Sequence, residues 1–210
     1  MFNLVRWRYL LLVALAVLLI SPTLFLVLAA AFLAYLAVRR VNPLAFFIRR
    51  SLDAYLKEVE ELLRDLAVEG RASFVSRRGR VYILAPAKMG EGAAYAVLRS
   101  PVDVVRPYLT NPVARLLLKA KTVETLETQL YLHLVSTGLA KSVYLHAGAK
   151  SVIVEIRRPR AKTPPAYREA VGTIEAAIAA ALVAAATRRQ VEIEGEEEGR
   201  DKRVVVLKTG

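Results

Sequence analysis

Few side chains in this sequence carry the chemistry of a catalytic or metal-binding site. The chain has two histidines, His133 and His146, and no cysteine, which excludes thiolate catalysis, disulfides, zinc ribbons and iron–sulfur ligation. No third ligand stands at metal-site spacing beside either histidine. We therefore expect both histidines to be structural, and we assign no metal ligand.

The central acidic residues do not form a recognisable acid–base pair. Asp103, Glu124, Glu127 and Glu155 stand among lysines and arginines, so ion pairs explain them. The serines lack a Gly-x-Ser-x-Gly elbow, and the glycines of residues 88–92 lack the Lys-Ser/Thr that a phosphate loop needs. We assign no catalytic and no cofactor-binding residue.

Basic residues are the most prominent polar feature. The net charge is +12, and residues 71–160 contribute +10 of it, with fifteen basic and five acidic residues. Next to a bilayer, each basic residue gains about 1 kcal/mol from anionic headgroups. We interpret three clusters as a surface for anionic headgroups or another anionic partner; solvated edges and nucleic-acid binding are the alternatives, although no nucleic-acid motif accompanies the charge. The members are Arg77, Arg78, Arg80, Lys119, Lys121, Arg157, Arg158, Arg160 and Lys162.

The feature that places these clusters beside a membrane is an apolar run near the N-terminus. Residues 9–38 contain no charged side chain. A run of this length is typical of a membrane-spanning segment, and it is longer than the apolar region of a cleaved signal peptide. We predict that residues 1–40 form a transmembrane anchor.

The middle of the run indicates how the anchor crosses the bilayer. Ser21 and Pro22 are a cap followed by a favoured first helical residue, which predicts two short helices joined as a hairpin. Arginines flank both ends of the run, and a hairpin keeps both basic ends in the cytoplasm, whereas one Pro-kinked span would leave one end outside. We favour the hairpin, with a cytoplasmic soluble domain, and keep the kinked span as the alternative.

Residues 41–70 predict a long amphipathic helix that links the anchor to the rest of the chain. Asn42 and Pro43 repeat the cap-then-proline signal. Apolar residues then recur every three or four positions, at Leu44, Ile48, Leu52, Tyr55, Val59, Leu62 and Leu66. Phe46 and Phe47 stand beside arginines at its start, which suits the headgroup layer.

Residues 71–210 predict one basic α+β domain with a mainly antiparallel sheet covered by helices, because hairpin-like strand pairs alternate with helices. Ser100 with Pro101 is a further helix start. Glu175 argues against a third span in the last helix, whose small residues at every fourth position suit packing on a sheet or on a second copy. The expected strands are 72–77, 81–85, 93–98, 142–146, 151–157, 190–194 and 203–207, and the expected helices are 101–109, 112–137 and 165–189.

The order of these elements resembles a group of poorly characterised archaeal membrane proteins. Members of that group have a short hydrophobic hairpin, an amphipathic helix and a cytoplasmic α/β region. The hairpin at residues 10–38 and the segment LKEVEELLRDLAVEGRASFV, residues 56–75, carry the resemblance. The absence of cysteine and the low methionine content are also typical of thermophilic proteins.

These observations predict a protein of the cell membrane that acts by binding. We expect a non-catalytic scaffold, sensor or assembly subunit whose partners are anionic headgroups and a second copy or another membrane protein. One alternative is a membrane-tethered enzyme or ligand-binding module with its site near His146 and Glu155. The other is a protein that tethers nucleic acid to the membrane.

Overall fold

The computed structural model describes residues 43–210 except 69, 90–91, 110–122 and 149, together with the isolated positions 23, 26, 27 and 30. The chain divides into two compact units, Met1–Pro43 and Leu44–Gly210. Apart from the four isolated positions, the predicted anchor lies outside the described residues. The described helices and strands all belong to the second unit, apart from Pro43, the first residue of its first helix.

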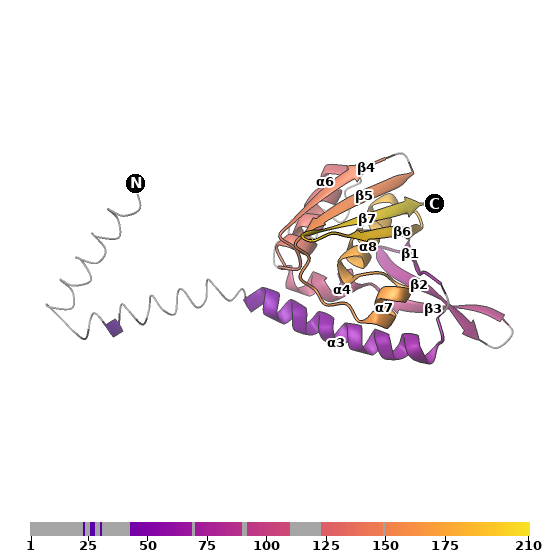
Figure 1. The fold of residues 1–210 in the computed structure, drawn as a ribbon, viewed down its shortest axis with the longest axis horizontal. Coiled ribbons are helices and arrows are strands. Elements are labelled where there is room, and N and C mark those ends of the chain that lie inside the picture. Colours follow the sequence, from indigo (N-terminus) through magenta and orange to yellow (C-terminus); the bar gives the residue numbers. More distant parts are fainter. Residues whose placement is uncertain are drawn as a thin grey trace. The chain divides into compact units, whose positions relative to one another are not determined.

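The second unit is an α+β structure built on one antiparallel sheet (Figure 1). All seven predicted strands are present, and their order across the sheet is β3-β2-β1-β6-β7-β5-β4. Segments distant in sequence therefore meet in the middle of the sheet, where β1 pairs with β6. The strands are β1 Ser73–Arg77, β2 Arg80–Met89, β3 Gly92–Arg99, β4 Ser142–Ala147, β5 Ser151–Arg157, β6 Val191–Glu198 and β7 Lys202–Thr209.

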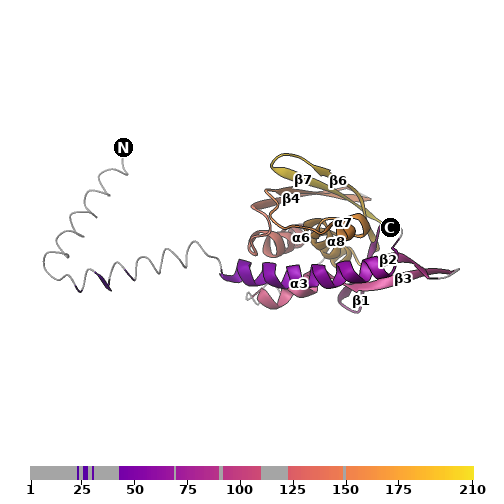
Figure 2. The same ribbon diagram turned by 60° about the horizontal axis from the view of Figure 1, so that its bottom comes forward.

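Alternation along the strands gives the sheet two different faces. In β5, Val152, Val154 and Ile156 are buried, while the residues between them are more exposed. The buried side chains face the helices, which lie on one side of the sheet (Figure 2). The other side, called the open face below, exposes Tyr95 and Val97 on β3 at 64% and 62%.

Helix α3, Pro43–Asp65, follows the predicted amphipathic stripe over most of its length, and Leu56 is buried in addition. Ile48, Leu52 and Val59 are buried as expected. Leu62 is 42% exposed, however, and Leu63 takes the buried position, because a helix returns to the same face after about 3.6 residues. The helix ends at Asp65, earlier than the predicted stop near residue 70, and it packs into the same compact unit as the sheet.

The predicted helix over residues 165–189 is wrong in one respect, because it is two helices. Helix α7, Pro165–Ala170, and helix α8, Ile174–Thr187, are separated at Gly172. The φ angle of Gly172 is +101°, a conformation that side chains disfavour and that a continuous helix does not use. The break allows α8 to pass beneath β1 and β6 while α7 stays beside α3, where the Tyr55 and Tyr167 rings meet edge to face.

Shorter helices complete the layer. The predicted cap at Ser100 is confirmed, since its Oγ accepts a hydrogen bond from the Val102 amide at 3.3 Å. The elements are α4 Pro101–Val105, the 3₁₀ helix η1 Arg106–Tyr108, α6 Val123–Leu130 and the π-helix η2 Tyr131–Val135. Residues 110–122, which include the predicted helix start at Asn111, lie outside the described residues.

One described helical stretch, Pro165–Thr187, is long and apolar enough to cross a membrane. Its most apolar window is 78% buried inside the protein. Residues Ile174 to Ala184 are all buried, between the sheet on one side and α4 and α6 on the other. This stretch is therefore the core of the α+β unit.

Candidate functional site

The structure separates the basic residues that the sequence analysis grouped on one surface. Arg77, Arg78 and Arg80 lie at the turn between β1 and β2 and are all exposed. Arg157 ends β5, and Arg158 and Arg160 follow it. Lys162 comes next and is exposed, whereas Lys119 and Lys121 lie outside the described residues.

Strand register places the two described clusters at opposite ends of the sheet. β1 pairs with β6 only at Ser73 and Phe74, and β6 then runs away from Arg77. At the far end, Arg157 is the partner of Lys202 on β7. About ten residue steps separate Arg77 from Arg157, which corresponds to about 30 Å along the strands. One ligand of small size cannot contact both clusters.

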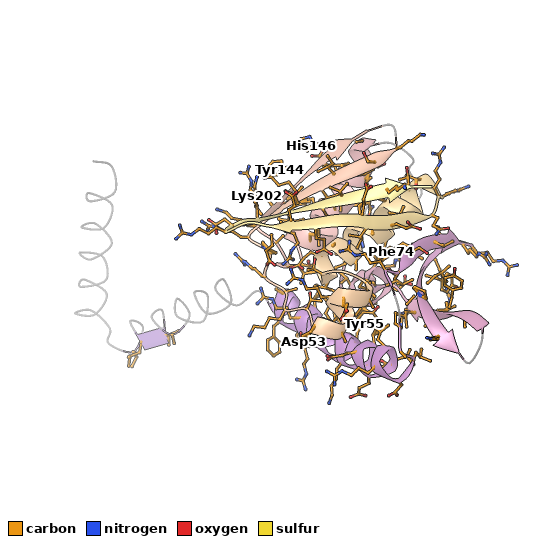
Figure 3. The ribbon with its side chains drawn as sticks, turned by 45° about the vertical axis from the view of Figure 1, so that its right-hand side comes forward. Asp53, Tyr55, Phe74, Tyr144, His146 and Lys202 are labelled. Carbon is orange, nitrogen blue, oxygen red and sulfur yellow. The ribbon has the colours of Figure 1, made fainter. Side chains whose placement is uncertain are left out.

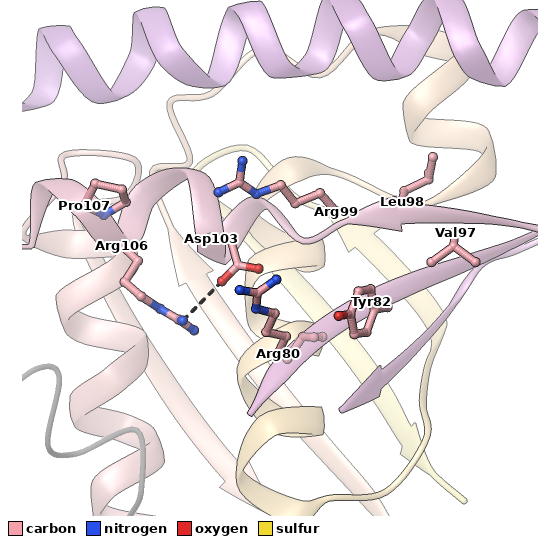
Figure 4. Close-up of a pocket in the computed structure, with 9 residues that line it drawn as sticks. Arg80, Tyr82, Val97, Leu98, Arg99, Asp103, Arg106 and Pro107 are labelled. Atoms are coloured by element: carbon pink, nitrogen blue, oxygen red, sulfur yellow. Dashed lines mark ion pairs between the residues drawn. The ribbon is translucent and has the colours of Figure 1, made fainter. Parts of the chain in front are cut away.

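The first cluster borders a hollow of about 850 Å³ (Figure 4). The hollow lies where β2 begins and β3 ends, beside α4 and η1. Arg80, Arg99 and Arg106 line it, with Asp103 as the acidic residue of the lining. Tyr82 and Val97 supply apolar surface. Its volume is within the range of about 300–1,000 Å³ typical of ligand pockets.

A second hollow of about 620 Å³ adjoins the first on the open face. Tyr82 and Val97 line both hollows, so the two adjoin at these side chains. Arg77 and Arg78 stand at its edge, and Val75 and Leu84 add to its apolar floor. We call the two hollows together the basic groove. It is lined by Val75, Arg77, Arg78, Arg80, Tyr82, Leu84, Val97, Arg99 and Arg106, with Asp103 at one side.

The charge of the basic groove is mostly uncompensated. Asp103 pairs with Arg106 at 3.3 Å, three residues away on the same helical turn. In the part of the chain that the structure describes, the other four arginines of the groove form no ion pair. Arginine presents a planar fork of donors that matches phosphate and carboxylate oxygens. The groove can therefore hold an anionic group.

Helix α3 fixes the position of this end of the sheet. The Tyr55 hydroxyl donates a hydrogen bond to the Arg99 carbonyl oxygen at 2.6 Å, and burial raises the pKa of Tyr55, which keeps the hydroxyl protonated. In the first half of the helix, Ser51 Oγ lies 2.5 Å from the Tyr108 hydroxyl, next to Pro107, which also lines the larger hollow. The basic groove thus lies beside the first half and the middle of α3.

Two of the four described residues of the second basic cluster, Arg157 and Arg158, lie close to an acidic side chain. Arg157 Nε donates to Glu155 Oε1 at 2.7 Å, and its guanidinium lies over the Tyr144 ring at 4.9 Å. The hydrogen bond from Arg157 lowers the pKa of the Glu155 carboxyl. Arg158 lies 4.0 Å from Asp201. These contacts confirm the ion-pair interpretation of Glu155, as the Arg106 contact does for Asp103.

The alternative site near His146 and Glu155 is a surface patch. Tyr144, His146 and Lys202 lie on the part of the sheet formed by β4, β5 and β7, away from Tyr55 on α3 (Figure 3). Their strand neighbours are Glu155, which pairs with Tyr144, and Ile153, which pairs with His146. His146 is exposed and Glu155 is engaged by Arg157, so the patch offers an ion pair on an open sheet rather than an enclosed acid–base pair.

His133 is buried completely, on the π-helix η2. Its Nδ1 lies 2.9 Å from the Gln129 carbonyl oxygen and therefore donates to it. Burial lowers the pKa of His133 from 6.5 to about 4, and the positive charge of Arg106 acts in the same direction. No group of three or more His, Asp or Glu side chains in the described residues could hold a metal ion.

A chain of ion pairs that runs from the buried Glu175 at the start of α8 to the surface was not predicted from the sequence. Arg203 contacts Glu175 at 3.0 Å and Glu198 at 2.9 Å, and Glu198 contacts Arg168 at 2.7 Å. Burial raises the pKa of Glu175, although Arg203 opposes the shift. The Ala161 amide also donates to Glu175 Oε1 at 3.0 Å. These partners compensate the negative charge of Glu175. From the sequence, this residue was used only as an argument against a membrane-spanning helix.

Arg99 and Arg106 are the groove residues that sequence reasoning missed. Arg99 follows the predicted strand 93–98 and Arg106 lies inside the predicted helix 101–109, and neither belongs to a run of charge. The register that sets Arg99 opposite Tyr82 brings Arg99 to the groove.

Comparison with known proteins adds no family to this description. No family model matches the chain, and neither a curated protein nor a solved structure matches it.

Proposed function

We propose that this is a membrane-anchored, non-catalytic binding protein whose cytoplasmic domain holds an anionic partner in the basic groove. The observation that carries the proposal is four exposed arginines without ion pairs in the described chain, set around an apolar floor on a sheet face that no described helix covers. Unpaired arginines beside exposed apolar side chains are typical of surfaces that bind anionic ligands or membranes.

The start of α3 supports the membrane anchor. Phe46 and Phe47 are 57% and 55% exposed and contact each other edge to face, with ring centroids 5.8 Å apart. Arg50 is exposed beside them, and Arg49 donates to the Gly138 carbonyl oxygen. Aromatic rings next to arginines suit the headgroup layer, and the uncharged run of residues 9–38 ends five residues before this helix.

Single-cysteine labelling in intact cells tests the anchor and its orientation. Since the chain has no cysteine, Phe2→Cys and Gly210→Cys each create one labelling site. We expect a membrane-impermeant maleimide to label neither variant until the cells are opened, because a hairpin keeps both ends in the cytoplasm. Labelling of Gly210→Cys alone in intact cells would mean one span and an external domain, which would contradict the proposal.

A second candidate function is the tethering of nucleic acid. Tyr82 and Tyr95 lie on the same open face as Arg80 and Arg99, and aromatic rings beside basic residues can stack bases. Full-length protein in nanodiscs that fails to retain single-stranded DNA or RNA at low salt removes this candidate, because low salt maximises phosphate contacts.

A further inference from the structure

We propose that the basic groove binds the phosphate of an anionic phospholipid headgroup from the bilayer in which the chain is anchored. This inference rests on the proposed membrane anchor and adds the ligand class of the site. Three features carry it: the arginines of the groove, its apolar floor, and the short length of chain between its contacts on α3 and the predicted membrane segment.

The arginines favour a phosphate group. Arg80, Arg99 and Arg106 line the larger hollow and can direct several N–H donors at one bound anion. Asp103 already holds one side of Arg106, which orients that guanidinium without cancelling the charge of the others. With Arg77 and Arg78 on the adjoining hollow, the lining carries five positive charges against one negative charge.

The floor and rim favour a ligand that also has an apolar part. Val75, Leu84 and Val97 form the floor of the smaller hollow, which opens on the sheet face. Val97 and Tyr95 are the most exposed apolar side chains on this end of the sheet. Exposed apolar side chains beside arginines gain free energy by entering the boundary between headgroups and acyl chains. A soluble inorganic anion would leave this apolar surface in water.

The chain between the predicted membrane segment and the groove's contacts on α3 is short. Ser51 contacts Tyr108 next to the groove, and Ser51 lies only eight residues after Pro43. The helical segment adds about 12 Å, and the five residues from 38 to 43 add at most about 17 Å. No more than about 30 Å of chain therefore separates residue 38 from Ser51, which contacts Tyr108 beside the groove.

A fluorescent probe on Tyr95→Cys tests the inference in the full-length chain. Tyr95 is exposed at the rim but does not line the hollows, so the probe reports on the groove without filling it. The labelled protein is reconstituted in nanodiscs of phosphatidylcholine with rising fractions of phosphatidylglycerol. We expect the emission to shift to the blue and to saturate with the anionic lipid.

Two pairs of charge-removing substitutions test whether the lipid-dependent shift in emission comes from the groove. Arg80→Gln with Arg99→Gln removes two charges from the groove, whereas Arg160→Gln with Arg200→Gln removes two exposed charges from the far end of the sheet. At about 1 kcal/mol per arginine, the groove variant should bind about thirtyfold more weakly. The control variant should behave like the unchanged protein. Equal responses of the two variants would overturn the assignment to the groove.

Further experiments distinguish a phospholipid from other anionic ligands and test the membrane anchor independently of the groove. Addition of inorganic phosphate to phosphatidylcholine discs should leave the emission unchanged; an equal shift would identify a soluble-phosphate site and overturn the lipid assignment. Tighter binding of a single-stranded oligonucleotide would overturn it in favour of nucleic acid. A chain that stays soluble without detergent would overturn the anchor, while a chain that embeds but ignores phosphatidylglycerol would overturn the groove alone.

Discussion

The two histidines illustrate how position decides the chemistry of a side chain. His133 is fully buried on η2, where its Nδ1 donates to the Gln129 carbonyl oxygen. His146 is exposed on the edge strand β4. Burial lowers the pKa of His133 to about 4, so this ring is neutral in the folded protein at neutral pH. Its role is structural, and its titration is coupled to folding.

Stability should therefore depend on pH through His133. The unfolded chain binds a proton near pH 6.5, whereas the folded ring does so only near pH 4, so stability is complete above 6.5 and declines as the pH falls towards 4. We expect His133→Phe to remove about 3 kcal/mol of this decline. Urea unfolding of the full chain in micelles, followed by circular dichroism across pH, measures it. His146→Phe is the control, and identical pH slopes for His133→Phe and the unchanged protein would contradict the prediction.

The break between α7 and α8 determines how the core is assembled. Gly172 takes a positive φ, the Thr173 amide donates to Glu196 at 3.0 Å, and the Ile174 amide donates to Thr163 Oγ1 at 3.0 Å. Distant side chains thus cap the first amides of α8, which have no partner within the helix. The caps and the glycine together allow an almost entirely apolar helix to begin inside the protein.

Substitution of Gly172 should be costly. In Gly172→Ala, the new Cβ meets Glu196 Oε1 and Ile193 Cδ1, and the residue must also keep a φ of +101°. We expect a loss of about 1–3 kcal/mol from backbone strain, with a further loss from the disturbed Glu196 cap. Gly195→Ala is the matched control, because a Cβ there has no neighbour within 4 Å. Chemical unfolding of both full-length variants is the test, and equal stabilities would show that the break tolerates a side chain.

At the scale of the whole molecule, one apolar segment belongs to the core and another is predicted to lie in the bilayer. Hydropathy does not separate them, since Pro165–Thr187 is long and apolar enough to span a membrane. Burial identifies Pro165–Thr187 as the core segment, because Ile174 to Ala184 are covered by the sheet and by α4 and α6. The small side chains of Ala176 and Ala180 permit this close packing, as the sequence suggested for a helix lying on a sheet.

Cysteine protection distinguishes a core helix from a membrane span. Ala179 is fully buried, so we expect Ala179→Cys in reconstituted full-length protein to react with maleimide only after urea is added. Tyr95→Cys, on the open face, should react without urea when the discs contain phosphatidylcholine alone. A cysteine within a bilayer span would stay protected in urea, and that result would contradict the placement of α8.

The strands and helices of the described domain could be predicted from the sequence because their signals are local. Alternation with period two marks β5, and an apolar stripe of period 3.6 marks α3. The ion pairs of Asp103 with Arg106 and of Glu155 with Arg157 were also expected, since the partners are two or three residues apart. The uncharged run that predicts the membrane anchor is likewise a property of consecutive residues.

Only the tertiary structure determined which residues that are distant in the sequence lie next to each other. Strand order and register set Arg99 opposite Tyr82, place Arg77 and Arg157 at opposite ends of the sheet, and bring Arg203 to Glu175. Such pairs follow from how strands align and how helices pack on them, which depends on the free energy of the whole core rather than on neighbouring residues. The sequence by itself therefore determined most of the elements, while the break between α7 and α8 and the groove depend on the three-dimensional arrangement.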